Sequence, residues 1–522
     1  MSSSLPHTII VRQERETAVG PFQVLIMLSL SLGAIAWGEA LIFGGERLQF
    51  QSYLALLGFY GAASAVFVLS RIRKGKLQVF EIPVYLTVMS FLQYGLAPLR
   101  NFIDPTLMDR YLSSNGEELV QALIYCILGM VGFWAGCQAV RRKQSGQMSS
   151  GLSEEDTLPA SRQAFIMLSA IAIYAIGFGT KFYLLRSQLF SYTANGEKYW
   201  ANLASMQVLS VISQFGTFAL VVATIERYRN RSNATWNVLF WGIFSCEILW
   251  GLVSGMKGVI FQNFVVLALV SSVIQRRLNL RWVVLPFFAL VLLFPISDAY
   301  RGLVHGRGEQ VTSFVGAGRL GRMAFQDATR EGANRGSLWS RGKVSTVQRF
   351  DLLTSVAQVL TLGARTSMVK SDLHWWMLPI YPFVPRLVWP SKPILNEGGR
   401  FAAVLAGASG SIATIGTSTA VTYPGDLYLQ FGLLGMPVGM FLLGMVAQLL
   451  TNRAGGLIDR QNLFIYTCVF LFGFPMEADV FLFWAGFIRL MVILYVLSRA
   501  IYGPRSLPSR PLPSSPVLAR KS

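Results

Sequence analysis

Three basic residues lie in a proline-rich segment of the chain, residues 374–401. They are Arg386, Lys392 and Arg400. The segment is aromatic and apolar enough to lie at membrane depth, but its prolines exclude a regular spanning helix. These prolines are Pro379, Pro382, Pro385, Pro390 and Pro393. Irregular backbone near a bilayer persists only where protein buries it or where it lines a wet cavity, and a cation held there needs an anion beside it. We therefore expect this segment to bind an anionic ligand.

Two further arginines precede this segment. Arg301 follows an apolar run, and Arg349 lies within residues 344–360, where apolar residues recur every three or four positions. This spacing predicts an amphipathic helix at the membrane interface. Because a guanidinium group binds phosphate oxygens in a bidentate way, a diphosphate is the anion that suits these arginines and Arg386. The plainer interpretation of Arg349 is a solvated charge on a packed surface helix.

Candidates for acid–base chemistry are few. His374 and Glu397 lie near the two ends of the proline-rich segment, and Asp426 begins the next apolar run. A carboxylate or an imidazole could accept the proton of an attacking hydroxyl group. The competing interpretations are structural, since Asp426 could cap a helix and His374 could be an ordinary interfacial histidine. Trp389 is a candidate for sugar binding, although interfacial anchoring is the commoner role of tryptophan.

Several familiar site patterns are absent from the sequence. No H-E-x-x-H, C-x-x-C or D-x-D pattern suggests a catalytic metal, and three scattered histidines do not build a metal site alone. The stretch 336–345 has the wrong glycine spacing for a P-loop, and the G-x-S-x-G elbow of hydrolases is missing. We therefore expect neither a metal nor a cofactor.

The composition is that of a membrane protein. Hydrophobic residues make up 53% of the 522 residues and charged residues only 14%, against about 25% charged in soluble proteins. Many apolar runs reach the roughly 20 residues that a bilayer requires. The formal net charge of +19 comes from basic residues scattered between these runs. The positive-inside rule explains them better than nucleic-acid binding does, so the lipid bilayer is an expected partner and nucleic acid is not.

The apolar runs predict an all-α polytopic protein of about 12 transmembrane helices, with one large extracytoplasmic loop that contains short amphipathic or re-entrant helices. Basic clusters follow the second and fourth runs, which places both termini in the cytoplasm. The expected parts are an N-terminal membrane bundle of about nine spans (1–297), the loop that forms the expected active region (298–421), about three C-terminal spans (422–498) and a basic, proline-rich cytoplasmic tail (499–522). The loop holds 14 lysines and arginines against 7 aspartates and glutamates. This excess of positive charge suggests an anionic ligand.

Particular spans carry charged residues. The first predicted span covers residues 21–43, the tenth 427–450 and the eleventh 462–478. The charged residues within spans include Glu39, Glu247 and Arg489. Such residues suggest function, but pairing between helices explains them equally well.

Four stretches in a fixed order resemble the oligosaccharide repeat-unit polymerases, the Wzy-type O-antigen polymerases. They are YRG (300–302), RFDLL (349–353), PRLVWPSKP (385–393) and GDLYLQFGLLG (425–435). The number of spans and the large exported loop are also similar to that family. Its members often have glutamate where Asp426 stands. The resemblance is strongest over residues 295–450.

The resemblance implies polymerisation of lipid-linked repeat units without metal or cofactor, for O-antigen or exopolysaccharide synthesis at the bacterial cytoplasmic membrane. A growing polymer would pass from its polyprenyl-diphosphate carrier to the next lipid-linked unit. A chain-length regulator and a flippase are the protein partners that it implies. Arg386, Asp426, His374 and Glu397 would be catalytic, and Arg301, Arg349, Lys392, Arg400 and Trp389 would bind diphosphate or sugar. Two alternatives are an O-antigen ligase, which uses another acceptor, and a transporter of lipid-linked oligosaccharides.

Overall fold

A computed structural model of the chain shows a helical protein. It describes residues 48–72, 79–103, 116–141, 158–191, 194, 198, 202–231, 233–275, 277–279, 281–306, 311–335, 347, 350–362, 374–384, 388–389, 391–393, 397–405, 420–453 and 459–503. No strand occurs in these residues. The all-α architecture expected from the sequence is thus confirmed.

The protein is a multi-pass membrane protein. In the part of the chain that the structure describes, nine helical segments are long and apolar enough to cross a bilayer, and the bent helix α12 makes up to ten. The first predicted span, residues 21–43, lies outside the described residues. Between the ninth and tenth expected spans the described residues contain the short helices α15 and α16, as expected, and the longer helix α13.

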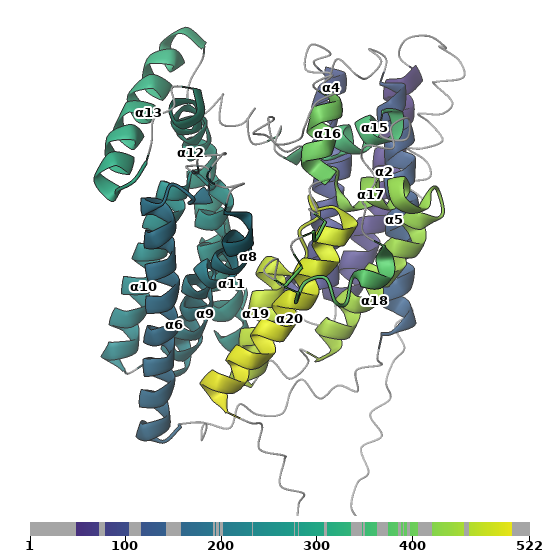
Figure 1. Cartoon of the computed structure of the whole chain (residues 1–522). Coiled ribbons are helices and arrows are strands. Elements are labelled where there is room, and N and C mark those ends of the chain that lie inside the picture. Colours follow the sequence, from purple (N-terminus) through teal and green to yellow (C-terminus); the bar gives the residue numbers. More distant parts are fainter. Residues whose placement is uncertain are drawn as a thin grey trace, which may run out of the picture.

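One group of helices contains the N-terminal described spans and part of the C-terminal region (Figure 1). Its members are α2 (Leu48–Ile72), α3 (Ile82–Ser90), the π-helical turn Phe91–Leu96, α4 (Leu99–Ile103), α5 (Glu117–Ala139), α15 (Leu353–Thr361), α16 (Glu397–Leu405), α17 (Tyr423–Phe431) and α18 (Gly435–Arg453). The π-helical turn brings the carbonyl of Gln93 to the backbone N–H of Leu352, which donates to it at 3.2 Å. This bond docks the start of α15 onto the spans.

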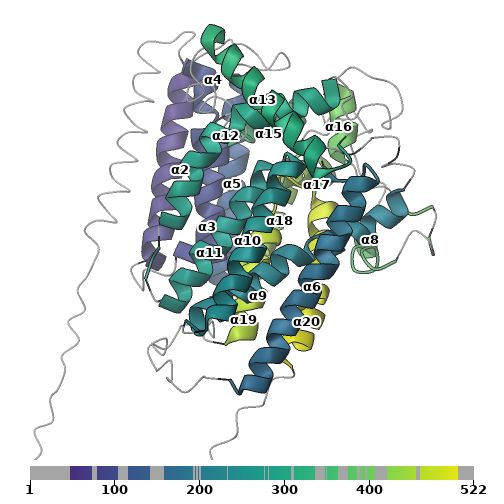
Figure 2. The ribbon, with the colours of Figure 1, turned by 90° about the vertical axis from the view of Figure 1, so that its left-hand side faces the viewer.

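A second group holds the central spans (Figures 1 and 2). Its members are α6 (Ala160–Arg186), α8 (Leu203–Ser213), α9 (Phe215–Arg229), α10 (Ala234–Ser254), α11 (Lys257–Gln275), α12 (Arg281–Gly306) and α13 (Phe314–Arg335). Helix α12 contains Pro286 and Pro295 and bends by 51° between Phe288 and Leu293. Proline explains the bend, because Pro295 has no N–H for the carbonyl one turn earlier. Helix α13 packs against α12.

The last two helices pack against helices of the two groups and so connect them. These are α19 (Arg460–Phe472) and α20 (Val480–Tyr502). Helix α19 packs against α9 and α11, and α20 packs against α6 and α17. The ring of Phe218 lies edge-on to that of Phe472, with 5.8 Å between centroids. Side chains of both groups therefore belong to one apolar core.

Two of the expected spans differ from the structure. The apolar run 427–450 is broken near Gly432, which has φ +71° and separates α17 from α18. Asp426 thus lies on a short helix of its own rather than at the mouth of a span. Helix α19 has 13 residues and ends at Gly473, so it is shorter than the span expected at 462–478.

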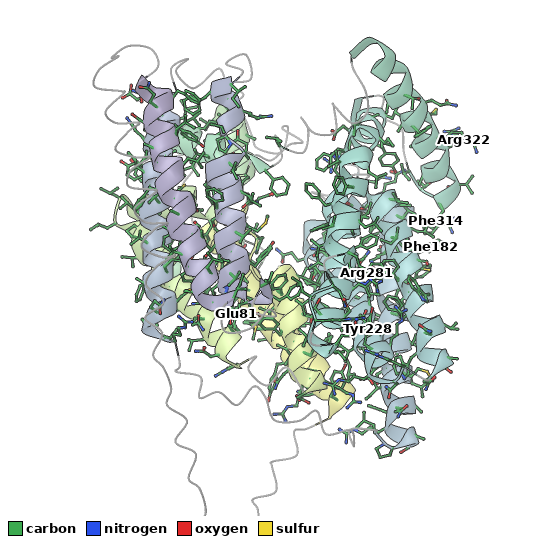
Figure 3. All side chains as sticks on the ribbon, turned by 180° about the vertical axis from the view of Figure 1, so that it is seen from behind. Glu81, Phe182, Tyr228, Arg281, Phe314 and Arg322 are labelled. Atoms are coloured by element: carbon green, nitrogen blue, oxygen red, sulfur yellow. The ribbon has the colours of Figure 1, made fainter. Side chains whose placement is uncertain are left out.

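The C-terminal ends of several helices meet at one end of the first group. Arg71 pairs with Glu81 at 2.7 Å, and the side chain of Asn452 donates to the carbonyl of Val140 at 2.8 Å. Glu81 is near the lower end of its helices in Figure 3, whereas Arg322 is near the upper end of the second group. Helices α2, α5 and α18 therefore place their C-terminal ends together.

Glycines let α5 and α18 approach closely. A Cβ atom added to Gly136 would lie 2.0 Å from the carbonyl oxygen of Phe441, and one added to Gly444 would lie 2.1 Å from that of Phe133. Both contacts are with backbone, which cannot rotate away. Small residues at such positions are the usual means by which membrane helices pack tightly.

Gly136→Ala is expected to push α5 and α18 apart and to destabilise the protein by about 1–3 kcal/mol. The measurement is the thermal unfolding midpoint in detergent. Gly58→Ala in α2 is the matched control, because no atom lies within 4 Å of its added Cβ. Equal midpoints for the two variants would show that the approach of α5 and α18 is looser than described.

Candidate active site

The proline-rich segment is folded around the ammonium group of Lys392. This side chain is 4% exposed and donates to the carbonyls of Tyr381 and Val384 at 2.7 and 2.8 Å. It also lies 4.1 Å from the centroid of the Tyr381 ring. The hydroxyl of Tyr381 in turn donates to the carbonyl of Pro393 at 2.6 Å. Because the prolines prevent a helix, these carbonyls need another donor, and the three ammonium protons supply it.

The segment rests on the first turns of α20. Tyr381 forms a small apolar cluster with Phe481 and Ala485, against which Trp389 also packs. The rings of Tyr381 and Trp389 are perpendicular, with 6.3 Å between centroids. Between residues 374 and 393 the described part of the segment forms turns and a short 3₁₀ helix, Trp375–Met377, and its last residues begin α16. The irregular backbone expected from the prolines is therefore present at the start of a membrane span.

Three buried carboxyl groups lie where α16, α17 and α20 meet. Glu397 begins α16 and is 1% exposed, Asp426 lies in the first turn of α17, and Asp479 is the N-cap of α20. Asp479 Oδ1 accepts from Leu482 N–H at 2.6 Å, and Asp426 Oδ2 accepts from Val480 N–H at 2.8 Å. Two carboxyl groups therefore share the N-terminus of α20, where negative charge is stabilised.

Glu397 differs from its two neighbours. Both of its carboxyl oxygens are buried, and no N–H group of the described residues donates to them; the hydrogen-bond partner of this side chain is the carboxyl group of Asp479. Its charge acts on Asp426 and Asp479. A buried carboxyl group whose hydrogen-bond partner is another carboxyl group is costly, and such groups often take part in function.

A strained residue fixes the position of Asp426. Thr422, the N-cap of α17, has φ +68°, which is unusual for a β-branched residue. Its hydroxyl accepts from Gly425 N–H at 3.2 Å, and the next residue, Tyr423, donates its N–H to the carbonyl of Met476 at 3.0 Å. The strain is thus held by bonds that tie α17 to the turn before α20.

Burial raises the pKa values of the two aspartates by different amounts. Burial raises the pKa of Asp426 to about 6, against the stabilising hydrogen bonds from Val480 and Gln430. Burial, followed by the charges of Glu397 and Asp426, raises the pKa of Asp479 to about 9. Asp479 is therefore the weaker acid of the two, and its carboxyl group shares a hydrogen bond with that of Glu397. Such divergence is typical of sites that handle protons.

The stability of the protein should fall as pH rises. The folded-state pKa values of both aspartates exceed the ordinary 3.8, so the folded state binds more protons, and this contribution is lost as pH rises through about 6 and then about 9. Asp479→Asn keeps a capping side chain that does not titrate. We expect its thermal unfolding midpoint in detergent to depend less on pH between about 6 and about 9. Parallel profiles for the variant and the wild type would contradict the assignment.

The other predicted site residues are distributed as follows. His374 is exposed and stacks on Trp376, with 6.0 Å between ring centroids. Arg400 is half-buried one turn after Glu397 in α16. Arg301 lies near the end of α12, in the other helix group, where its Nε and Nη2 donate to the carbonyl of Gly255 at 3.1 and 2.9 Å. Arg386 and Arg349 lie outside the described residues.

The structure brings together Glu397 and Asp426 from the sequence-based candidates and adds Asp479. Asp479 follows an apolar run in the turn Pro475–Asp479 and resembles an ordinary loop residue. Its position directly before the last apolar run was the available signal for an N-cap. No group of three or more His, Cys, Asp or Glu within the described ranges is arranged to hold a metal ion.

One family model matches the chain. It covers residues 179–497, more than half of the sequence and every element from α6 into α20, and its description is Domain of unknown function (DUF8712). No curated protein and no solved structure matches.

Proposed function

The chain belongs to this family of unknown function, and on its own residues we propose that it joins lipid-linked oligosaccharide repeat units at the membrane surface. The proposed enzyme is a glycosyltransferase of the Wzy-type O-antigen polymerase kind. The observation that carries the proposal is the buried group of Glu397, Asp426 and Asp479 at the N-terminal end of a membrane span, whose first turns pack against the proline-rich segment.

The proposed reaction has a defined balance of bonds and protons. A hydroxyl oxygen of the acceptor sugar forms a bond with the anomeric carbon of the donor polymer. The bond between that carbon and the diphosphate oxygen breaks, and the diphosphate leaves with the electron pair on its polyprenyl carrier. Glu397 accepts the hydroxyl proton, because no N–H group of the described residues occupies its oxygens.

The two aspartates have supporting roles in this proposal. Each already accepts a backbone N–H of α20, so they hold the outer end of that helix and set the electrostatic field at Glu397. The charge of Glu397 in turn raises the pKa of Asp426, so the groups are electrostatically linked.

Basic residues are proposed to stabilise the leaving diphosphate. Its developing charge is best met by fixed cations. Arg386 and Arg349 remain the predicted ligands, together with Arg400, which shares α16 with Glu397. Lys392 acts in this scheme by holding the segment in shape, since its ammonium group binds two carbonyls of that segment.

The proposed orientation places this site outside the cytoplasm. The ends of α2, α5, α18 and α20 carry Arg71, Arg141, Arg453 and Arg499, and the positive-inside rule assigns such ends to the cytoplasm. The N-terminus of α20, with its carboxyl groups, then lies at the outer surface. This is the side at which lipid-linked repeat units would be joined.

The test uses the purified full-length protein in lipid vesicles with a single lipid-linked repeat unit. Polymerisation predicts a ladder of products that differ by one repeat unit. An O-antigen ligase would instead modify an added lipid acceptor without a ladder, and a transporter would only move the unit across the bilayer. Either of these results would contradict the proposed function.

A further inference from the structure

Arg489 is a charged residue in the middle of a membrane span. It is the tenth residue of α20 and is half-buried. No hydrogen bond, ion pair or ring contact to Arg489 is found among the described residues. By contrast, Lys181 and Glu247, which also lie within spans, pair at 2.6 Å. An arginine at this depth is costly unless an anion meets it.

The helix face that carries Arg489 is open. Leu482 and Val496 lie seven residues before and after it, on the same stripe of α20, and are 47% and 58% exposed. Gly486, almost one turn earlier, has no atom within 4 Å of an added Cβ. Side chains on a helix lean towards its N-terminus, so the guanidinium group has room over Gly486. This face is therefore accessible from the apolar part of the bilayer.

The guanidinium group lies just below the candidate active site. Ala485, which packs against Tyr381 of the proline-rich segment, is about one turn or 6 Å along the helix from Arg489. Asp479 caps the same helix about 15 Å from the Cα of Arg489. The lean of the side chain shortens this separation. One helix thus places a cation beneath the three carboxyl groups.

We propose that Arg489 binds the diphosphate group of a long-chain lipid that lies along this face of α20. The inference rests on the proposed function, because it names the residue that holds the lipid carrier of the substrate. Exposed apolar side chains flank Arg489, and they favour a lipid chain over a free anion from water. A guanidinium group gives bidentate bonds to phosphate oxygens, and these are strong where water is scarce.

Binding of polyprenyl diphosphate to the full-length protein in phosphatidylcholine nanodiscs tests this site. Arg489→Gln is expected to weaken binding by about tenfold or more, and Arg489→Lys by less. Arg499→Gln is the matched control, because Arg499 is in the last turn of α20 and stacks on Tyr495 at 5.1 Å. It should bind polyprenyl diphosphate as the wild type does. Polyprenol, which has no phosphate, should bind all of these proteins with the same affinity.

Three outcomes would overturn the proposal. Equal affinity of the wild type and Arg489→Gln would remove Arg489 from the site. Competition by inorganic diphosphate at similar concentration would show a site for a free anion. Competition by phosphatidylglycerol at similar concentration would show only the ordinary attraction of a basic residue to head groups.

The same assay separates this inference from the proposed reaction. Glu397→Gln should bind polyprenyl diphosphate normally even though it transfers poorly. If the wild type makes no polymer but Arg489→Gln still loses affinity, the lipid site stands and the reaction fails. If the wild type makes polymer and Arg489→Gln binds normally, only the lipid site fails.

Discussion

Replacing Glu397 by glutamine is expected to slow chain extension by about 10²–10⁴-fold. Glutamine fills nearly the same volume but cannot accept the hydroxyl proton. Since no N–H group of the described residues donates to the buried oxygens of Glu397, the amide should be accommodated, and its oxygen can still accept from the carboxyl group of Asp479. The measurement is the initial rate at which polymer forms from lipid-linked units in vesicles.

Glu117→Gln is the matched control for this change. Glu117 is the first residue of α5, as Glu397 is of α16, but its side chain is exposed. It should leave the rate unchanged, and both variants should keep the thermal stability of the wild type. Transfer by Glu397→Gln at the wild-type rate would show that another group accepts the proton.

The second large effect is on stability. Lys181→Met is expected to destabilise the protein by about 3–5 kcal/mol, because it leaves the carboxyl group of Glu247 buried in the spans without its partner. The ammonium group of Lys181 contacts both oxygens of Glu247, at 2.7 and 2.6 Å. Gly216 lies against this pair, and a Cβ there would be 2.3 Å from Glu247 Oε1. The pair therefore joins α6 and α10 across α9.

The unfolding midpoint in detergent measures this effect. The double variant Lys181→Met, Glu247→Leu removes both charges and should recover most of the lost stability, since an apolar pair has no unmet charge. If the single and double variants unfold together, the ion pair is not the source of the effect. If neither variant differs from the wild type, the contact does not persist in solution.

The sequence was sufficient for the parts of the structure that depend on local pattern. Hydropathy predicted the all-α membrane architecture, and most of the expected spans within the described residues exist. Pairing between helices was one of two interpretations of Glu247, and its contact with Lys181 agrees with it. Prolines predicted the irregular backbone of the segment around Tyr381, because a proline ring disrupts a helix and proline has no backbone N–H to donate.

The arrangement of the site depended on tertiary contacts that local pattern does not contain. Asp479 lies 82 positions after Glu397 in the numbering, and the two become neighbours because α16 packs on α17, which contacts α20. The apolar run that contains Asp426 looked continuous, and its break near Gly432 depends on the positive φ of that glycine. Lys392 is a predicted phosphate ligand, and the structure adds that its ammonium group donates to two backbone carbonyls, whose need for a donor arises from the fold.

The most direct test of the central claim is the number of carriers released for each sugar linkage formed. Purified protein is incubated with one lipid-linked repeat unit, and free polyprenyl diphosphate and new linkages are both quantified. Transfer between lipid-linked units predicts one polyprenyl diphosphate released for every linkage, with Glu397→Gln slowing both equally. New linkages without released carrier, or transported units without linkages, would contradict the account.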